Sequence, residues 1–325
     1  MKKEFVSAII VNWNGKKWLK KCLDSLESQS YKKIEIVFVD NASYDGSVQF
    51  VKQKFPKIKI IESKKNLGLT KGINLGIAES KGEYLLLINN DAWVEKDFIK
   101  SLYEFYTKKD FAVIAPREKR YDKSQDFKCN TTIDISGSPA YFTPTYSRPD
   151  KTFYLSVCFF VSKKEYLYSG GLDTDFFMYF EDVDWFWRLS LFGKKFTYIK
   201  DVFIYHAGAG STGSGIKYNT FLWRNQNSLQ MLIKNYSLSM LLLVLPMYLL
   251  QNIFEILFFM LLLKPKIALS YIQGWVFNIR NLRRTIRKRR KIQNRRVVED
   301  PEIIKKMYPG FGKLIFLRNY LTGKI

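Results

Sequence analysis

Short apolar runs alternate with helix-like segments through the first 115 residues. The runs are rich in Val, Ile and Leu and cover residues 5–11, 34–39, 58–61, 84–88 and 111–115. Each is typical of a strand buried on both faces. The segments between them repeat apolar residues at helical spacing, so we expect helices at 16–28, 46–55, 69–79 and 96–108. This alternation predicts an α/β fold with a mostly parallel, doubly wound sheet.

The middle of the chain continues with less regular elements. Residues 116–155 are rich in turn-forming Gly and Pro, and we interpret them as hairpins or a flexible loop on the acceptor side. The pattern then predicts a strand at 154–161, a helix at 180–192, a strand at 196–205 and a helix at 217–235. Between the last two elements, four glycines predict a mobile loop: Gly208, Gly210, Gly213 and Gly215.

Residues 238–263 form a long apolar segment. As a helix it would reach about 39 Å at ~1.5 Å per residue, enough to cross a hydrocarbon core of about 30 Å. Pro246 interrupts the segment, and Gln251, Asn252 and Glu255 lie on one helical face. A transmembrane helix, a re-entrant helix and a helix lying in the membrane interface therefore all stay open.

The positive charge is concentrated at the C-terminal end. Of the formal net charge of +23, residues 264–325 contribute +14, from 17 basic and 3 acidic residues. Residues 267–290 place an apolar stripe beside Arg280, Arg283, Arg284 and Arg287, which predicts an amphipathic basic helix. Such a helix suits the anionic headgroups of a membrane surface.

The three cysteines, Cys22, Cys129 and Cys158, are widely spaced and form no CxxC pair. They therefore indicate neither a zinc site nor a disulfide framework, and they favour a reducing, cytosolic compartment. The apolar N-terminal run is followed by Asn12-Trp13-Asn14-Gly15 without a small-residue cleavage site, so we expect a buried strand and not a signal peptide.

Polar residues follow three of the predicted strands: Asn12, Asp40 and Asp91. Ligands of doubly wound sheets bind beyond the carboxyl ends of the strands, so we expect these side chains to line one crevice. Asp91 suits Mg²⁺ or Mn²⁺, although Asp also caps helices. Asp40 suits a hydrogen bond from a pyrimidine N–H; alternatively, it only stabilises the turn Asp-Asn-Ala-Ser. The turn at Asn66-Leu67-Gly68 and the following Lys71 suit phosphate binding, although this pattern alone is a weak indication.

The segment from Phe177 to Arg188 places three carboxylates among aromatic side chains. Such groups are costly to desolvate, which favours a functional role over a structural one. We interpret Asp182 as a general base, because a carboxylate of ordinary pKa, about 3.9, is ionised at pH 7. Glu181 and Trp185 are candidate acceptor contacts, and Asp184 is explained by an ion pair with Arg188 four residues on.

His206 is the only histidine of the chain, and it ends a predicted strand. A neutral imidazole suits Mn²⁺, so we interpret it as a metal ligand or phosphate contact. The sequence Gly208–Gly213 also fits GxGxxG, but no acidic residue follows at the required distance and no second strand comes after the helix. Dinucleotide binding is therefore disfavoured.

Seven motifs in order over residues 5–225 resemble family 2 glycosyltransferases, most closely rhamnosyltransferase-like and galactofuranosyltransferase-like members. The motifs are Ile9–Asn14, Val39–Ser47, Asn66–Gly68, Leu87–Asp91, Gly170–Asp173, Tyr179–Asp184 and Tyr205–Gly208. The resemblance implies a GT-A fold and inverting, metal-dependent transfer of a sugar, such as rhamnose from dTDP-rhamnose or a hexose from a UDP-sugar. No QxxRW motif follows, so we expect single additions and not processive synthesis.

The resemblance also implies roles for individual residues. Asp40 would contact the base of the nucleotide, Asp91 and His206 would hold Mn²⁺ or Mg²⁺, and Asp182 would be the catalytic base. Asn89 stands at the first position of the DxD motif, where the family has Asp, which weakens the metal assignment slightly. The remaining expected donor contacts are Asn12, Asn14, Asn66, Gly68, Lys71, Asn89 and Asn90. Arg224 is a candidate for the acceptor or for the departing charge.

We therefore expect a catalytic domain at 1–225, a helical membrane-associated region at 226–292 and a basic tail at 293–325. The apolar segment and the basic helix favour a lipid-linked or cell-surface glycan acceptor and a place on the cytoplasmic face of a membrane. Two alternatives stay open: a nucleic-acid-binding protein that uses residues 283–296, and a membrane scaffold without activity. No nucleic-acid-reading motif accompanies the charge, and Asp91, Asp182 and His206 together argue against a scaffold.

Overall fold

The computed structural model describes residues 4–121, 132–140, 152–155, 158–208 and 217–322. The chain folds into two compact units that are interleaved in sequence. The first comprises Met1–Cys129, Leu155–Phe177 and Lys195–Ser214, and the second Asn130–Tyr154, Met178–Lys194 and Gly215–Ile325. The catalytic-domain boundary expected at residue 225 stays a prediction.

The first unit is built on one eight-stranded sheet with the order β3-β2-β1-β4-β7-β6-β8-β5. Its strands are β1 (Val6–Asn12), β2 (Ile34–Asp40), β3 (Lys59–Glu62), β4 (Tyr84–Ile88), β5 (Ala92–Val94), β6 (Val113–Arg120), β7 (Cys158–Ser162) and β8 (Phe196–His206). Strands β1 to β4 pair in parallel, as do β6 and β8. Strand β7 is antiparallel to β4 and β6, and β5 is antiparallel to β8. The predicted α/β fold is confirmed.

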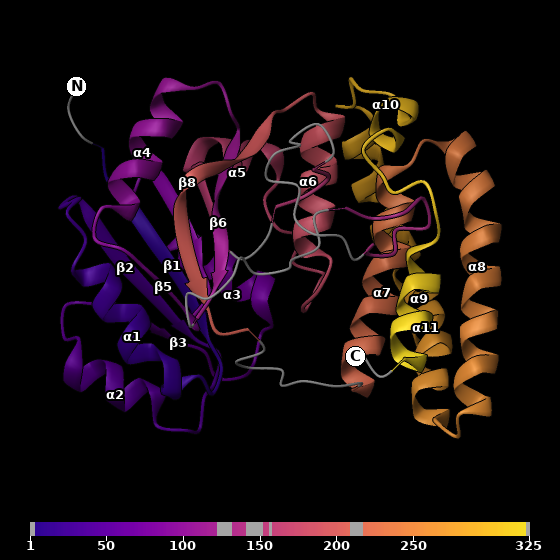
Figure 1. Ribbon diagram of the computed structural model, residues 1–325, viewed down its shortest axis with the longest axis horizontal. Helices are drawn as coiled ribbons and strands as arrows, with labels where there is room; N and C mark the ends of the chain where they lie inside the picture. The colour runs from indigo at the N-terminus through magenta and orange to yellow at the C-terminus, as the bar shows by residue number, and fades with distance from the viewer. Residues whose placement is uncertain (1–3, 122–131, 141–151, 156–157, 209–216, 323–325) are drawn as a thin grey trace. The chain divides into compact units, whose positions relative to one another are not determined.

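Helices cover this sheet because each has one apolar face. They are α1 (Lys16–Glu27), α2 (Ser47–Lys54), α3 (Leu69–Ala78), α4 (Phe98–Lys108) and α5 (Lys163–Ser169) (Figure 1). Helix α1 buries Leu19, Cys22, Leu23 and Leu26 at helical spacing. These side chains join one core cluster with residues of β1, β2 and β4. The packed core therefore holds in a fixed position the edge of the sheet where β1 and β2 end in polar residues.

The second unit consists mainly of helices: α6 (Glu181–Leu191), α7 (Tyr218–Asn235), α8 (Leu238–Leu261), α9 (Pro265–Gln293), α10 (Asp300–Ile304) and α11 (Gly312–Leu321). Figure 1 shows the long helices α7, α8 and α9 running alongside one another. The helices expected at 180–192, 217–235, 238–263 and 267–290 are confirmed, and Pro246 lies inside α8. The region expected as a basic tail, residues 293–325, contains α10 and α11.

A buried cluster of charges holds α6 to α7 in the second unit. Asp184 is fully buried, and its carboxylate lies 3.0 Å from Arg188 Nε and 2.9 Å from Lys234 Nζ. Asn235 Nδ2 donates a third contact to Asp184, at 3.1 Å. The predicted Asp184–Arg188 ion pair is confirmed, and Lys234 is a second cation that the helical spacing alone did not indicate. A carboxylate shared by two cations and an amide keeps its buried charge compensated.

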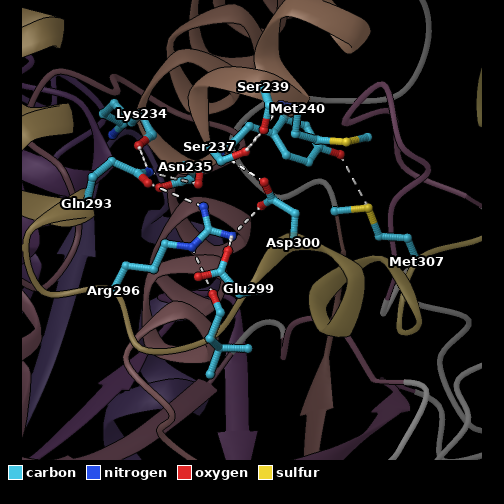
Figure 2. A network of polar contacts seen from close by, with 12 residues as sticks. Lys234, Asn235, Ser237, Ser239, Met240, Gln293, Arg296, Glu299, Asp300 and Met307 are labelled. Carbon is cyan, nitrogen blue, oxygen red and sulfur yellow. Dashed lines mark hydrogen bonds and ion pairs between the residues drawn. The ribbon is translucent and has the colours of Figure 1, made fainter.

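A second polar network joins the start of α8 to the end of α9 and the start of α10 (Figure 2). Asp300 accepts a hydrogen bond from the backbone N–H of Ser237 at 3.0 Å and lies 2.8 Å from Arg296 Nη2. Gln293 Nε2 donates to the backbone carbonyls of Lys234 and Asn235, both at 3.0 Å. These carbonyls end α7, so the network satisfies groups that a helix terminus leaves unpaired.

The substitution Asp184→Asn tests the buried charge cluster. It keeps the side chain's shape but leaves Arg188 and Lys234 without a countercharge, which costs about 3–5 kcal/mol when one partner of a buried pair is removed. We expect a loss of this size in the free energy of unfolding measured with urea. The matched control is Asp24→Asn, which removes a solvent-exposed pair with Lys20 and should cost less than about 1 kcal/mol. Equal losses would contradict the role given to Asp184.

Candidate donor and transfer sites

The carboxyl ends of β1 and β2 bring two of the predicted site residues into contact. The register pairs Asn12 with Asp40, and Asn12 Nδ2 donates to Asp40 Oδ1 at 3.1 Å. The other carboxylate oxygen accepts from the backbone N–H of Ser43 at 2.8 Å. Both side chains are buried. Asp40 is therefore held in one orientation by its neighbours, as a residue that reads a ligand must be.

The chain after β1 approaches the same cluster closely. Asn14 has a positive φ of 52°, and its side chain accepts from the backbone N–H of Tyr44 at 2.9 Å. Asn90 Nδ2 donates to Asn12 Oδ1 at 2.7 Å. A Cβ at Gly15 would come within 2.1 Å of Asn90 Nδ2, so only glycine permits this approach. Asn12, Asn14, Asp40 and Asn90 thus form one hydrogen-bonded cluster at the sheet edge.

The predicted turn at Asn66–Gly68 lies against the same region of the first unit. Asn66 Oδ1 accepts from the backbone N–H of Gly68 at 2.9 Å, and Asn41 Nδ2 donates to the carbonyl of Gly68 at 3.0 Å. Gly68 has a φ of +81°, and a Cβ there would lie 2.6 Å from the carbonyl oxygen of Phe177. Lys71 follows in the first turn of α3 with an exposed side chain, and Asn89 is half-buried at the end of β4.

The second predicted group, Asp91 and His206, is also brought together. Strand β5 pairs with β8 so that Ala92 lies opposite His206, and His206 Nε2 lies 3.1 Å from Asp91 Oδ1. Two residues that are 115 positions apart therefore meet, both of them buried. Asn90 belongs to the Asn12–Asp40 cluster and immediately precedes Asp91, so the two groups are adjacent along the chain.

Glu118 completes this group and was missed by the sequence analysis. Its Oε1 lies 2.6 Å from His206 Nδ1, and its side chain is 2% exposed. Burial disfavours the charged imidazolium, but the hydrogen bonds and charges of Asp91 and Glu118 outweigh burial and raise the pKa of His206 to about 10. No motif surrounds Glu118. It meets His206 only because β6 pairs in parallel with β8.

The donor atoms at Asp91 and His206 fit a divalent cation in type. A carboxylate and a neutral imidazole both bind Mn²⁺, and metal-binding histidines usually give their other nitrogen to a carboxylate, as His206 does to Glu118. Because its raised pKa keeps His206 protonated at pH 7, a metal ion bound through Nε2 would have to displace the proton that faces Asp91. No group of three or more His, Cys, Asp or Glu side chains is arranged for a metal ion among the residues the structure describes. A site of one or two protein ligands is typical of ions that also bind substrate phosphates.

Asp182 lies in the second unit, at the start of α6 beside Glu181. Burial raises the pKa of Asp182 to about 6, well above the ordinary value assumed from the sequence. Burial, followed by the charge of Asp182, raises the pKa of Glu181 to about 8. The two carboxyl groups titrate together, so near neutral pH the pair holds about one proton between them, which suits acid–base chemistry.

The residues before this pair have an unusual backbone. Tyr179 and Phe180 have φ values of 70° and 66°, a region that large side chains rarely adopt. Asn227 Nδ2 from α7 donates to the carbonyls of Met178 and Tyr179 at 2.9 and 2.8 Å and holds this conformation. Strained backbone of this kind persists where surrounding contacts enforce it, often at functional sites.

Two neighbouring cavities lie in the second unit. The one that contains Glu181 and Asp182 has about 480 Å³ of open space, and its other walls include Tyr154, Tyr179 and Arg224. The second cavity has about 580 Å³ and is lined by residues of α7, α8, α9 and α11. Both are lined by Pro139, Phe180 and Arg224, so they adjoin. Asp182 therefore faces a cavity, beside Glu181 and Arg224.

Trp185, which was expected to contact the acceptor, is fully buried and packs on Phe186, with ring centroids 5.3 Å apart. It is a core residue and lines neither cavity, so the structure corrects its assignment as an acceptor contact. The predicted mobile loop contains Gly208, Gly210, Gly213 and Gly215. The structure describes only Gly208, and the other three glycines lie outside the described residues.

Comparison with known proteins identifies the family. The sequence profile of Glycosyl transferase family 2 matches residues 7–171, about half of the chain. The chain therefore belongs to this family and is a glycosyltransferase that uses nucleotide-sugar donors. The resemblance to the family is confirmed. The rhamnosyltransferase-like or galactofuranosyltransferase-like subgroup stays a prediction.

Similar proteins and structures agree with this result. Glycosyltransferase GlyG of Streptococcus pneumoniae serotype 4 is 25% identical over 235 residues, which cover 64% of this chain and 72% of GlyG. The structure of S. aureus TarS 1-349 with UDP-GlcNAc has a TM-score of 0.57, 15% identity, and covers 98% of this chain and 92% of TarS. GalNAc-T7 with UDP, GalNAc and Mn²⁺ has a TM-score of 0.58 and 15% identity, covering 72% of this chain and 48% of GalNAc-T7. At these identities the structures show the GT-A fold alone.

The raised pKa of Glu181 predicts how stability depends on pH. The folded state holds this proton more tightly than the unfolded state, whose carboxyl has a pKa near 4.5. The contribution of Glu181 is therefore fully present below about pH 4.5 and is lost as pH rises toward 8. We expect Glu181→Gln to unfold at nearly the wild-type urea concentration at pH 5 and at a higher one at pH 9. Parallel curves for the two proteins would contradict the shift; the exposed Glu27→Gln is the control.

Proposed function

We propose that this glycosyltransferase inverts the anomeric configuration of its sugar and uses Asp182 as the general base. The observation that carries the proposal is the buried Glu181–Asp182 pair, which faces a cavity and in which burial raises the pKa of both carboxyl groups. A carboxylate with a pKa near 6 is a stronger base than an ordinary Asp and is still ionised at neutral pH. It therefore suits removal of a proton from an acceptor hydroxyl.

The donor is proposed to bind at the sheet edge of the first unit. Asp40 would accept a hydrogen bond from the base of the nucleotide, and the cluster of Asn12, Asn14 and Asn90 would position the ribose and phosphates. Asn66, Gly68, Lys71 and Asn89 are the further proposed contacts. The presence of UDP-GlcNAc in the TarS structure and of UDP in the GalNAc-T7 structure supports a uridine nucleotide. Phe177 touches Gly68, and Asp182 follows it five residues later in the chain.

In the proposed reaction, Asp182 accepts the proton of the acceptor hydroxyl. The hydroxyl oxygen forms a bond to the anomeric carbon from the side opposite the diphosphate, and the bond between that carbon and the diphosphate oxygen breaks. Asp91 and His206 would hold Mn²⁺ or Mg²⁺, which when bound neutralises the charge of the leaving diphosphate. Glu118 would orient His206 through Nδ1. The Mn²⁺ in the GalNAc-T7 structure supports this assignment.

The substitution Asp182→Asn tests the base. Removing a general base lowers turnover by about 10²–10⁴-fold, so we expect kcat to fall by this factor while UDP binding is unchanged. Wild-type kcat/KM should also fall as pH drops through about 6, because protonated Asp182 cannot accept a proton. Release of UDP from a panel of UDP- and dTDP-sugars measures both. Asp201→Asn, at an exposed position of β8, is the control. Near-normal turnover of Asp182→Asn would exclude the role.

Membrane association is proposed from the outer faces of α8 and α9. Helix α8 is the one helix among the described residues that is long and apolar enough to cross a membrane. One stripe of α8 is buried in the unit, and its polar members Asn252 and Glu255 contact Lys313 of α11. The opposite stripe exposes apolar side chains: Leu242, Leu243, Leu250, Ile253, Phe254, Leu257 and Leu261. A helix with one face bound to its own unit favours lying in the interface over spanning the bilayer.

Helix α9 adds charge to this apolar surface. It exposes Ile272, Val276 and Ile279, and further along it Arg284, Arg287, Lys288 and Lys291 surround a shallow cavity. Exposed apolar residues beside a basic cluster fit an anionic membrane better than a nucleic acid. We therefore place the protein on the cytoplasmic face of a membrane, with a lipid-linked or cell-surface glycan as acceptor. The cysteine usage supports the cytoplasmic side.

Vesicle binding tests this surface. Each basic residue near an anionic bilayer contributes about 1 kcal/mol, so Arg284→Gln/Arg287→Gln should weaken binding to vesicles of phosphatidylcholine and phosphatidylglycerol by roughly thirtyfold. Binding is measured by co-sedimentation at low and high salt. Lys20→Gln/Lys21→Gln on α1 removes the same charge from the first unit and should change little. Equal binding by all three proteins, or wild-type protein that stays in the supernatant, would refute the proposed surface.

A further inference from the structure

The cavity between α7, α8, α9 and α11 has no role in the proposed transfer step. Its walls are aromatic, formed by Phe180, Phe221, Tyr248 and Tyr271. The rings of Phe221 and Tyr271 lie 6.3 Å apart, and both aromatic side chains are buried. Aromatic walls with a few polar groups between them are typical of a binding site for a small organic group.

Polar groups are placed between these aromatic walls. Lys313 Nζ contacts Glu255 and donates to Asn252 Oδ1 at 2.7 Å, and it lies 5.3 Å from the centre of the Tyr248 ring. The hydroxyls of Ser228 and Tyr248 are hydrogen-bonded at 2.7 Å. A lipid chain makes no hydrogen bonds, so its binding here would bury these polar groups against an apolar ligand, which is unfavourable. A ring that carries hydroxyl groups can pack its faces on the aromatic walls and hydrogen-bond its hydroxyls to the polar groups.

Arg224 lies where the two cavities adjoin. Its guanidinium stands 5.0 Å from the centre of the Tyr179 ring and has no carboxylate partner among the residues that the structure describes. Glu255 compensates Lys313, so Arg224 leaves this cavity with one net positive charge. Arginine presents a planar fork of N–H donors that matches a phosphate.

The geometry points to a binding site for a glycosyl phosphate in this cavity: the sugar ring lies against the aromatic walls beside Lys313, whose ammonium is 5.3 Å from the centre of the Tyr248 ring and 5.9 Å from that of Tyr271, and its phosphate lies on Arg224. The inference rests on the proposed transferase function and specifies its acceptor. The adjoining cavity then places the hydroxyl to be glycosylated beside Asp182. The glycosyl phosphate is either the headgroup of a lipid-linked glycan or a soluble sugar phosphate.

The test is calorimetric titration of the full-length protein with three probes: glucose 1-phosphate, glucose and inorganic phosphate. We expect glucose 1-phosphate to bind at least tenfold more tightly than either part alone. Arg224→Gln should weaken its binding by about ten- to a hundredfold, the effect of one charge-assisted contact. Arg318→Gln, at an exposed arginine of α11 that lines neither cavity, is the control. Equal affinities for phosphate and glucose 1-phosphate, or unchanged binding by Arg224→Gln, would overturn the inference.

A second variant examines the sugar end of the cavity. Glu255→Gln/Lys313→Gln removes both charges of the pair, so no buried charge is left uncompensated. It should lose the preference for glucose 1-phosphate over inorganic phosphate, whereas Arg224→Gln loses affinity for both. A retained preference would count against the sugar position. Comparing glucose 1-phosphate with its octyl phosphodiester separates the two sources, because tighter binding of the diester assigns a lipid-linked acceptor.

Titration of UDP on the same samples keeps the two proposals separate. Asp40→Asn should weaken UDP binding and leave the binding of glucose 1-phosphate unchanged. If UDP does not bind the wild-type protein, the donor assignment fails while the cavity result stands. If UDP binds normally and glucose 1-phosphate binds only through Asp40, the cavity inference fails alone.

Discussion

The pairing of two strands brings together Asp91 and His206, the two proposed metal ligands. Strand β5 is only three residues long, yet its register against β8 sets Asp91 beside His206. The parallel pairing of β6 with β8 supplies Glu118 on the other side of the imidazole, after a register shift between Pro116 and Arg117. A one-residue slip of β8 would turn His206 to the opposite face of the sheet. The three side chains therefore depend on backbone hydrogen bonds more than on one another.

The second unit is organised by the cost of burying charge. Asp184, Arg188 and Lys234 are all nearly inaccessible, and each is tolerated because the others are present. Such a cluster adds little net stability compared with apolar packing, but it fails strongly when one member is lost. These contacts join α6, which also carries Asp182, to the end of α7.

Much of this arrangement could be predicted from the sequence. Buried parallel strands are short continuous apolar runs, so β1 to β4 and the polar residues at their ends were predicted. The contact of Asp91 with His206 was also predicted, because the family motifs point to both residues. Glu118 was not, since it lies in a stretch with no motif and reaches His206 through strand pairing. The raised pKa of Asp182 depends on burial in the folded unit. The aromatic residues next to Asp182 in the sequence do not predict how far burial raises this pKa.

Helix α6 shows how one segment can place three carboxyl groups in two different environments. Asp184 lies on the helix face turned toward α7, where it contacts Arg188 and Lys234 and joins the two helices. Glu181 and Asp182 stand one turn earlier, where the helix N-terminus favours negative charge but burial opposes it. Burial and mutual repulsion disfavour two ionised groups there at neutral pH, so the pair holds about one proton between its two carboxyl groups. The shared proton thus keeps the proposed base from being repelled by a second charge, and it leaves Arg224 as the nearby cation for an incoming anionic acceptor.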